Sequence, residues 1–130
     1  VADMNGDGFD DIVTYGASGS VGLATTILYN QSGTGFSSYT VPTDISSVQN
    51  LALTDFDCDG LPDMAVNSVN ELYVHINLGA SFSGGTKLDV GPRTVRAMTA
   101  GAYDAVRRAT IVLALPSAGG IDSVLVVGRN

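Results

Sequence analysis

Apolar and polar positions alternate along this chain in short runs, which are separated by clusters of Gly, Ser, Asn, Asp and Pro. Successive side chains of a strand point to opposite faces, so these runs predict short strands joined by tight turns. No segment keeps an apolar period of about 3.6 residues between capping residues, so no long helix is expected. We therefore predict an all-β fold. The expected strands are Asp11–Tyr15, Leu23–Tyr29, Phe36–Val41, Val48–Thr54, Met64–Asn67, Glu71–Asn77, Thr86–Val90, Val95–Ala100, Ala109–Leu115 and Ser123–Gly128.

One polar loop occurs twice in the chain, each time followed by an apolar strand. Residues 1–13 and 53–66 share the pattern D-x-[DN]-x-D-G-x-x-D, and its first residues, Asp3 and Asp55, are 52 positions apart. Self-similarity at a fixed spacing is the signature of a repeat architecture. The chain is therefore expected to consist of repeats.

The rest of each copy supports the same period. A second strand follows each loop and leads through an Asn and a Gly turn to a Phe, at Asn30–Phe36 and at Asn77–Phe82. A degenerate third copy occupies residues 97–130. A period of roughly 50 residues with four antiparallel strands fits one blade of a β-propeller. We divide the single segment 1–130 into repeats of roughly 1–47, 48–94 and 95–130.

These repeats amount to about two and a half blades. Propellers close with about four to eight blades. The sequence is therefore expected to be a fragment, a processed piece or one part of a larger propeller. The chain does not begin with Met. We accordingly expect that a leader has been removed or that the sequence begins inside a longer protein.

The two loops carry the clearest chemical signal. Calcium takes six to eight oxygen ligands, and alternate positions of a tight loop can direct side chains to one point. Gly8 and Gly60 supply permissive backbone where each loop turns sharply. We predict two Ca²⁺ sites. The metal ligands would be Asp3, Asn5, Asp7, Asp11 and the Phe9 carbonyl in the first loop, and Asp55, Asp57, Asp59, Asp63 and the Leu61 carbonyl in the second.

Other interpretations of the loops fit less well. Solvated Asp-Gly turns are common, but two copies in register, each leading into an apolar strand, favour a cation site. An EF-hand needs a Glu at loop position 12, where this chain has Thr14 and Val66, and both flanks are predicted strands. The single Cys, Cys58, excludes Cys-rich calcium repeats, an internal disulfide and a Cys-based zinc cluster.

The charge balance excludes some partners. The chain has 13 acidic and 6 basic residues and a net charge of −7. Nucleic-acid binding needs clustered Lys and Arg, so no nucleic-acid partner is expected, and an anionic membrane surface is disfavoured for the same reason. No apolar run approaches the roughly 18 residues that span a bilayer, so no membrane insertion is expected.

Several other residues have both a chemical and a structural interpretation. Cys58 occupies a non-ligand position and is expected to point outward, although a free thiol can pair with another chain. His75 has no second His or Cys beside it, which disfavours zinc. No G-x-S-x-G elbow supports a hydrolase. Arg107 and Arg108 supply either a fixed positive charge or ordinary surface. The tyrosines Tyr29, Tyr39, Tyr73 and Tyr103 either stack on sugar rings or pack in the core.

The repeated segments resemble the FG-GAP/VCBS repeats of integrin-α-like β-propellers. Asp3–Asp11 and Asp55–Asp63, with their apolar strands, match the calcium loop of that repeat, and the two Asn…Phe turns match its N-x-G-x-x-F end. The resemblance implies a blade whose first two strands are joined by a calcium-bound loop that braces the blade. The literal Phe-Gly and Gly-Ala-Pro signatures are absent. In the third copy Ala100, Ala102 and Arg108 replace loop carboxylates and leave Asp104, so no calcium is assigned there.

The function expected from this resemblance is a calcium-stabilised extracellular binding or adhesion module for glycan or protein ligands, secreted or on the cell surface. No catalytic constellation is apparent, and the chain is not expected to be an enzyme. The alternative is a structural or accessory part of a larger secreted assembly, such as a toxin subunit or filament, whose other chains complete the propeller. A polysaccharide lyase using Lys87, Arg93 and Arg96 is a third, weaker possibility.

Overall fold

The computed structural model describes residues 1–18, 22–42, 48–69, 71–90, 94–102, 109–115 and 123–128. These ranges contain ten strands and no helix, so the prediction of an all-β chain is confirmed for them. The strands are β1 (Ile12–Ser18), β2 (Gly22–Asn30), β3 (Phe36–Val41), β4 (Asn50–Thr54), β5 (Asp63–Asn67), β6 (Leu72–His75), β7 (Thr86–Leu88), β8 (Ala97–Ala102), β9 (Ala109–Leu115) and β10 (Ser123–Gly128).

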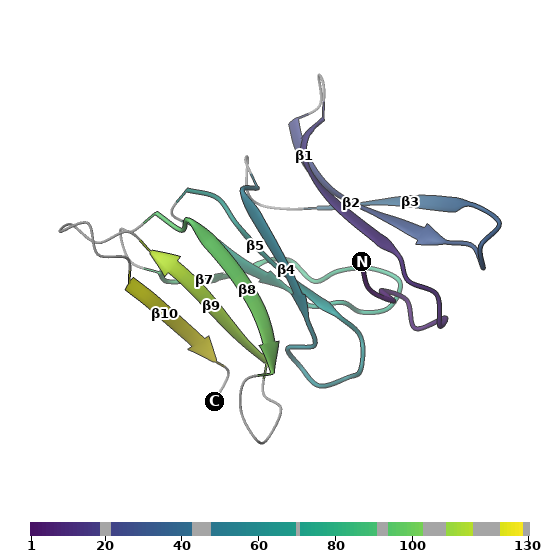
Figure 1. Cartoon of the computed structure of the whole chain (residues 1–130). Helices are drawn as coiled ribbons and strands as arrows, with labels where there is room; N and C mark the ends of the chain where they lie inside the picture. The colour runs from purple at the N-terminus through teal and green to yellow at the C-terminus, as the bar shows by residue number, and fades with distance from the viewer. Residues whose placement is uncertain are drawn as a thin grey trace.

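The strands form three antiparallel sheets in chain order. The first sheet is β1-β2-β3, the second is β4-β5-β6-β7, and the third is β8-β9-β10. Each strand pairs with its neighbour in sequence, as expected for meanders in which every turn reverses the chain (Figure 1). The second sheet lies between the other two in Figure 1, and β4 lies beside β8. Four strands per repeat were expected, whereas the described residues form sheets of three, four and three strands and no closed ring.

The first and second sheets are built on the same plan. In the second sheet β4 pairs with β5, ending at Thr54 opposite Asp63, and the carboxylate loop joins the two strands. In the first sheet a single bridge between Ala2 and Asp11 stands at the corresponding position. The outer hairpin of each repeat also corresponds, because Asn30 pairs with Phe36 and Asn77 pairs with Phe82.

The third sheet departs from this plan where its sequence lacks the loop carboxylates. Ala100 aligns with Asp55, the first acid of the second loop, but Ala100 lies within β8 and pairs with Ile111. Strand pairing continues to Ala102 opposite Ala109. The Ala100 side chain has no acceptor for backbone N–H groups, so it does not compete with the strand ladder as a carboxylate at this position does. The other residues singled out in the third loop, Asp104 and Arg108, lie outside the described residues.

Strand ends differ from the prediction by one to three residues in seven of the ten strands, and the ends of β1 and β6 are two examples. The strand expected to end at Tyr15 continues to Ser18, since Gly16 and Ser18 remain paired with β2. The strand expected to reach Asn77 ends at His75, because the Ile76 N–H donates to the Ser83 hydroxyl and the Asn77 N–H donates to a carboxylate. Side-chain acceptors of this kind compete with the ladder.

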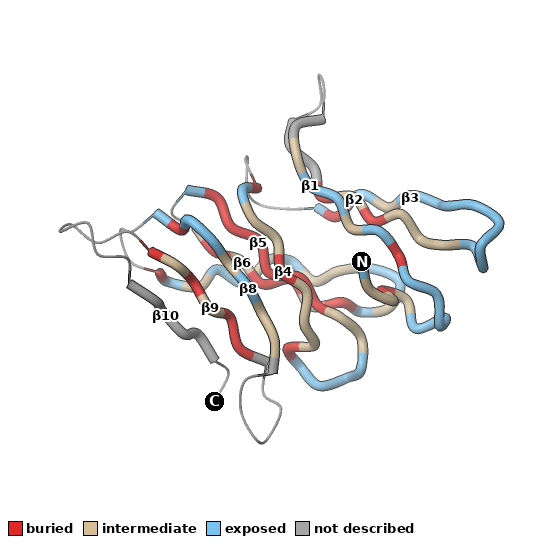
Figure 2. The backbone as a smooth tube through the Cα atoms, viewed as in Figure 1, coloured by how far each residue is buried: buried red, intermediate tan, exposed pale blue. Residues whose placement is uncertain are grey.

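The apolar core lies on both faces of the second sheet. All five residues of β5 are buried (Figure 2), and its three apolar side chains alternate between two clusters. Met64 and Val66 belong to a cluster shared with the first sheet, whereas Ala65 belongs to a cluster shared with the third sheet. The loops take part as well, because Met4 packs in the first cluster and Phe56, at the corresponding position of the second loop, packs in the other.

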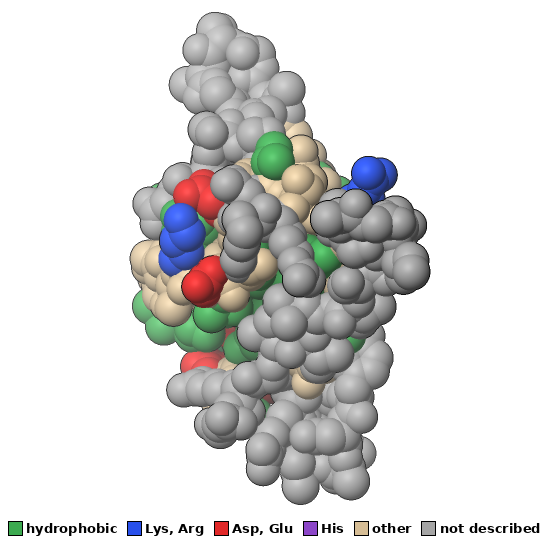
Figure 3. All heavy atoms as spheres, turned by 90° about the vertical axis from the view of Figure 1, so that its left-hand side faces the viewer, with side chains coloured by type: hydrophobic (Ala, Val, Ile, Leu, Met, Phe, Trp, Pro, Cys, Tyr) green, Lys and Arg blue, Asp and Glu red, His purple; other side chains and the backbone are tan. Residues whose placement is uncertain are grey.

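The surface in Figure 3 carries basic and acidic side chains singly, and the described part of that face shows no basic patch. One ion pair among the described residues has known geometry: the Lys87 Nζ lies 2.9 Å from the Glu71 Oε1, and both side chains are at least partly exposed. Exposed pairs of this kind contribute at most about 1 kcal/mol. Among the described residues no helix is long and apolar enough to cross a membrane.

The two clusters yield a prediction about stability. Met64→Ala and Leu113→Ala each truncate a fully buried side chain and should lower the free energy of unfolding by about 2–5 kcal/mol. Phe36→Ala truncates a side chain that is 54% exposed and should change the free energy of unfolding by about 0.5 kcal/mol. Urea denaturation of the three variants measures this. Equal losses in all three would contradict the assignment of the core.

Candidate metal centre

The second loop is folded around the carboxylate of Asp55. One oxygen of Asp55 accepts hydrogen bonds from the backbone N–H groups of Cys58 (2.7 Å) and Asp59 (3.2 Å), and the other accepts from Gly60 (3.0 Å). Cys58 and Gly60 both have positive φ, 67° and 95°, which allows successive N–H groups to point inward. The Cys58 side chain is exposed, as predicted for a non-ligand position.

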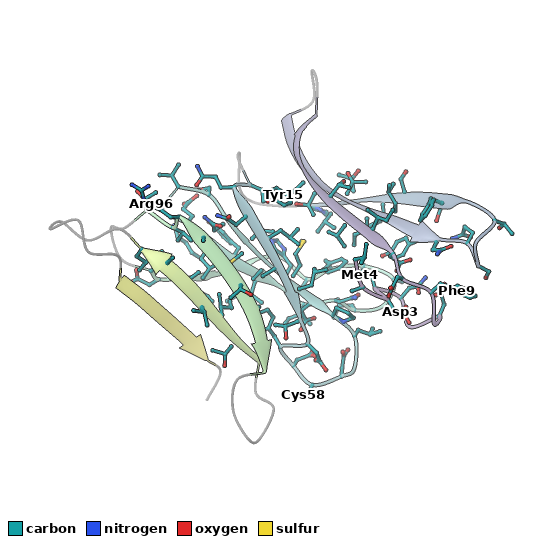
Figure 4. All side chains as sticks on the ribbon, in the orientation of Figure 1. Asp3, Met4, Phe9, Tyr15, Cys58 and Arg96 are labelled. Carbon is teal, nitrogen blue, oxygen red and sulfur yellow. The ribbon has the colours of Figure 1, made fainter. Side chains whose placement is uncertain are left out.

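The first loop has the same arrangement around Asp3. The Asp3 carboxylate accepts from the N–H groups of Gly6 (2.8 Å), Asp7 (3.1 Å) and Gly8 (2.8 Å). Figure 4 shows Asp3 and Met4 at the base of this loop and Phe9 at its outer side, with Cys58 on the separate bend of the second loop. The sequence repeat therefore corresponds to a repeat of local structure, bond by bond.

The last acid of each loop is fully buried and ties the loop to the following hairpin. Asp63 accepts from the backbone N–H of Phe56 at 2.6 Å and from that of Asn77 at 2.7 Å. Asp11 accepts from Met4 at 2.9 Å and from Asn30 at 2.8 Å in the same way. Burying a carboxylate is costly unless it is hydrogen-bonded, and these bonds satisfy both oxygens.

Asn77, just after β6, has a role that its place in the repeat did not reveal. The Asn77 side chain donates to the Met4 carbonyl (2.7 Å) and to the Pro62 carbonyl (3.1 Å), and it accepts from the Gly79 N–H (3.0 Å). Met4 belongs to the first loop, so Asn77 joins the two loops. The two Asn…Phe turns, at matching places in two repeats, were the only sequence signal for this role.

Three carboxylates of the second loop converge. Asp55, Asp57 and Asp63 each place an oxygen within 4.8 Å of the other two. Asp59 is outside this group, and its Oδ1 accepts the N–H of Leu61 at 2.8 Å. The three acids come from the start of the loop, its exposed middle and the buried start of β5. Convergent carboxylate oxygens are the donors that hard divalent cations prefer.

The predicted ligands of the first loop are arranged on the same backbone with one difference. Asn5 stands where the second loop has Asp57, and its amide nitrogen donates to the Asp7 Oδ2 at 3.1 Å. Asn5 also accepts from the Asp7 N–H, and Asp7 accepts from the Phe9 N–H. The assignment of all ten ligands, including the Phe9 and Leu61 carbonyls, therefore remains a prediction, although the two loops share one frame.

The electrostatics of the second loop favour a cation. Burial raises the pKa of Asp63; its hydrogen bonds from Asn77 and Phe56 act against this, and the nearby charges of Asp57 and Asp55 raise the pKa further. An acid whose pKa is raised on folding opposes folding when it ionises, so this destabilisation appears as the pH rises through the raised value. Residues 55–63 contain no Lys or Arg, so no base within the loop itself offsets these charges.

Asp3 behaves in the opposite way. The hydrogen bond from the Gly8 N–H is the main cause of the lowered pKa of Asp3, and weaker bonds from Gly6 and Asp7 contribute. A lowered pKa favours folding above the ordinary value of about 3.8, and this contribution is lost as the pH falls through the folded value. The carboxylate that organises the loop is therefore preorganised as an anion.

Comparison with known families identifies the repeat to which the two loops belong. The family model for an FG-GAP-like repeat matches residues 3–66, from the first acid of the first loop to the strand after the second loop. Residues 3–66 are an FG-GAP-like repeat. The resemblance inferred from the two loops is thereby confirmed. FG-GAP repeats form propeller blades, and the match covers both carboxylate loops of this chain. No curated protein and no solved structure matches the chain.

The other residues singled out in the sequence do not extend this centre. His75, in β6, is buried; its Nδ1 lies 3.2 Å from the Ser83 carbonyl, and its Nε2 has no hydrogen-bond partner among the described residues. Tyr29 and Tyr39 are partly buried, with ring centroids 6.5 Å apart, which favours a packing role. Tyr73 also packs against this cluster. The residues Arg93, Tyr103 and Arg107 lie outside the described part of the chain.

The link through Asn77 predicts unequal effects of two matched substitutions. Asn77→Ala leaves the buried Met4 carbonyl without its donor and should lower the free energy of unfolding by about 1–3 kcal/mol. Asn30→Ala removes a partly exposed amide whose donor bond, to the Asp10 carbonyl, is 3.3 Å long, and should cost about 0.5–1 kcal/mol. Chemical denaturation at one fixed calcium concentration compares them. A larger loss for Asn30→Ala would contradict the link.

Proposed function

We propose that this chain is a calcium-stabilised, non-enzymatic binding or adhesion module that acts outside the cell and recognises glycan or protein ligands. The observation that supports it most strongly is the convergence of Asp55, Asp57 and Asp63 within an FG-GAP-like repeat. The three carboxylates would repel one another without a cation. FG-GAP repeats often bind calcium at such a loop.

The donor set fits calcium better than other common cations. All three converging donors are carboxylate oxygens, with no thiolate or imidazole among them, which disfavours zinc and copper. Magnesium keeps near-ideal octahedral geometry and several waters, whereas calcium accepts six to eight oxygens in flexible arrangements. The Leu61 carbonyl and Asp59 would complete the coordination in the second loop.

We further propose a second calcium site in the first loop. Its frame of hydrogen bonds around Asp3 is the same as the frame around Asp55, and Asp11 is held like Asp63. Asn5 would supply a neutral amide oxygen in place of the Asp57 carboxylate. One carboxylate fewer predicts a lower affinity at this site, because ligand charge is one of the factors that set calcium affinity.

Calcium in this proposal braces the hairpins and takes no part in a reaction. The ion would hold the loop between the first two strands of each blade, and the surfaces of the blades would bind the ligand. Glycan and protein ligands, and an extracellular location, are what the FG-GAP family suggests. The fold alone does not determine the ligand.

A second candidate function is a structural part of a larger secreted assembly. It is favoured by the sheet edges: within the described residues, β10 is hydrogen-bonded to β9 on one side only, and the third sheet has three strands against four in the second. An edge strand offers unpaired backbone groups to another chain. Further blades, from this chain or another, would then cover these edges.

Calcium binding itself is tested with one variant and a matched control. Asp57→Ala removes one converging carboxylate whose side chain is exposed and, within the described part of the chain, accepts one long hydrogen bond, at 3.3 Å from the Asp59 N–H. We expect calcium affinity at the second loop to fall about tenfold or more, while calcium-free stability stays equal or rises because repulsion is relieved. Calorimetric titration and thermal unfolding, each with calcium and with chelator, measure both.

The control is Asp10→Ala, which makes the same charge change at an exposed position outside the predicted ligand set. It should leave calcium affinity and the calcium-dependent rise in Tm unchanged. Chelation that leaves the Tm of the unmodified chain unmoved would refute the calcium assignment. Equal effects of the two variants would mean that net charge matters and that the converging carboxylates do not form a site.

The choice between the two candidate functions is tested separately. A binding module should retain glycans or a defined protein ligand at millimolar calcium, with a signal that falls on chelation and in Asp57→Ala. A structural subunit should instead show a native mass several times 13.3 kDa that decreases on chelation. Native mass spectrometry and a glycan array, run on the same preparation, distinguish these results. A 13.3 kDa monomer without array binding would count against both.

A further inference from the structure

We propose that the two loops bind calcium cooperatively and that the Asn77 side chain carries the coupling between them. This inference rests on the proposed calcium sites and adds how they influence each other. The sites lie in different repeats, so independent binding would be the simple expectation. The hydrogen bonds around Asn77 join them instead.

The connection is continuous from one buried carboxylate to the other. Asp63, in the second loop, holds the Asn77 backbone N–H at 2.7 Å. The Asn77 side chain donates to the Met4 carbonyl at 2.7 Å, across 73 positions of sequence. The Met4 N–H donates to Asp11, in the first loop, at 2.9 Å. All four residues have exposed fractions of 0%, so water cannot replace these bonds without local opening.

A second contact joins the loops beside this path. The Leu61 side chain, in the second loop, lies over Gly6 in the first, where an added Cβ would meet its Cδ2 at 3.3 Å. The Leu61 carbonyl is a predicted calcium ligand, so ordering that carbonyl also positions the side chain against Gly6. The same side chain lies 3.8 Å from the position of an added Cβ at Gly79, in the turn next to Asn77.

These contacts explain how one ion favours the other. An ion in the second loop fixes Asp63, which fixes Asn77 and thereby the Met4 carbonyl at the base of the first loop. When the first loop opens, the Asn77 side chain loses its acceptor, the Met4 carbonyl. The hydrogen bond from the Asn77 N–H to Asp63 is then less well supported. The bound forms of the two loops therefore share contacts that the loosened forms lack, which is the condition for coupling. By linkage, each ion must raise the affinity of the other by the same factor.

Asn30 provides an internal control for this proposal. It occupies the position of Asn77 in the first repeat: its N–H holds Asp11 at 2.8 Å, and its side chain donates to the Asp10 carbonyl and accepts from Gly33. Pro62 and Gly79 are the corresponding partners of Asn77. Among the interactions with known geometry, the hydrogen bond to the Met4 carbonyl is made by Asn77 and has no counterpart at Asn30. Alanine at either position keeps the backbone N–H that binds the carboxylate.

The test measures calcium affinity at each loop while the other loop is disabled. Backbone amide signals of Gly8 and Gly60 in NMR titrations with calcium alone report the first and second loop separately. Asp7→Lys places a cation in the first loop, and Asp59→Lys does so in the second; both side chains are exposed. We expect each substitution to weaken calcium binding at the opposite loop by at least about fivefold, the lower end of usual coupling.

The variants of the asparagines then locate the coupling. In an Asn77→Ala background the effect of Asp7→Lys on the Gly60 titration should disappear, whereas in an Asn30→Ala background it should persist. A merely structural role of Asn77 would weaken binding at the second loop but leave the effect of Asp7→Lys unchanged, which would overturn the assignment to Asn77. Should Asn77→Ala fail to fold, Leu61→Ala serves in its place and should reduce the factor.

Failure of this proposal can be told apart from failure of the calcium sites. If neither the Gly8 nor the Gly60 signal responds to calcium in the unmodified chain, the proposed function itself is refuted. If both respond and each disabled loop leaves the other unaffected, the sites exist but are independent, and the coupling is refuted.

Discussion

The buried carboxylate at the end of each loop is the constraint on which this structure depends. Asp11 and Asp63 are fully buried, and each accepts one backbone N–H from its own loop and one from the end of the second strand. A charge taken out of water in this way requires both bonds. The same side chain therefore closes the loop, ends the hairpin and, at Asp63, takes part in the carboxylate cluster. A substitution of Asp63 would therefore change both the folding stability and the proposed calcium binding.

The strands were predictable from sequence because their signals are local. Alternating side chains and turn residues located all ten strands of the described structure. Strand ends were less predictable, since β6 ends where the Ser83 hydroxyl and the Asp63 carboxylate take over backbone N–H groups. These acceptors are distant in sequence or look like ordinary turn residues. The stacking of the three sheets was likewise beyond local signals, although the buried pattern of β5 reflects it.

The candidate site was predictable in its composition and less so in its geometry. The repeated acids identified both loops, and the repeat itself indicated the family. Sequence letters alone did not separate Asp57, which converges with Asp55, from Asp59, whose oxygen accepts a backbone N–H instead. The role of Asn77 was also hidden, because a contact across 73 positions leaves no periodic trace in a single sequence. Where Ala100 replaces the first acid, by contrast, no calcium was assigned, and the strand ladder continues through that position.

The bond between Asn77 and Met4 also bears on the order in which the chain acquires its structure during synthesis. It joins a residue of the second repeat to the loop of the first, so the second repeat supplies a bond that the first loop lacks when it is made. At about 5–20 residues per second, the 73 positions between the two residues take roughly 4–15 s to synthesise. Until then the Met4 carbonyl lacks its donor, and the first loop stays incomplete on the ribosome. The first loop is thus consolidated only after a delay of more than one repeat, and from the carboxyl side.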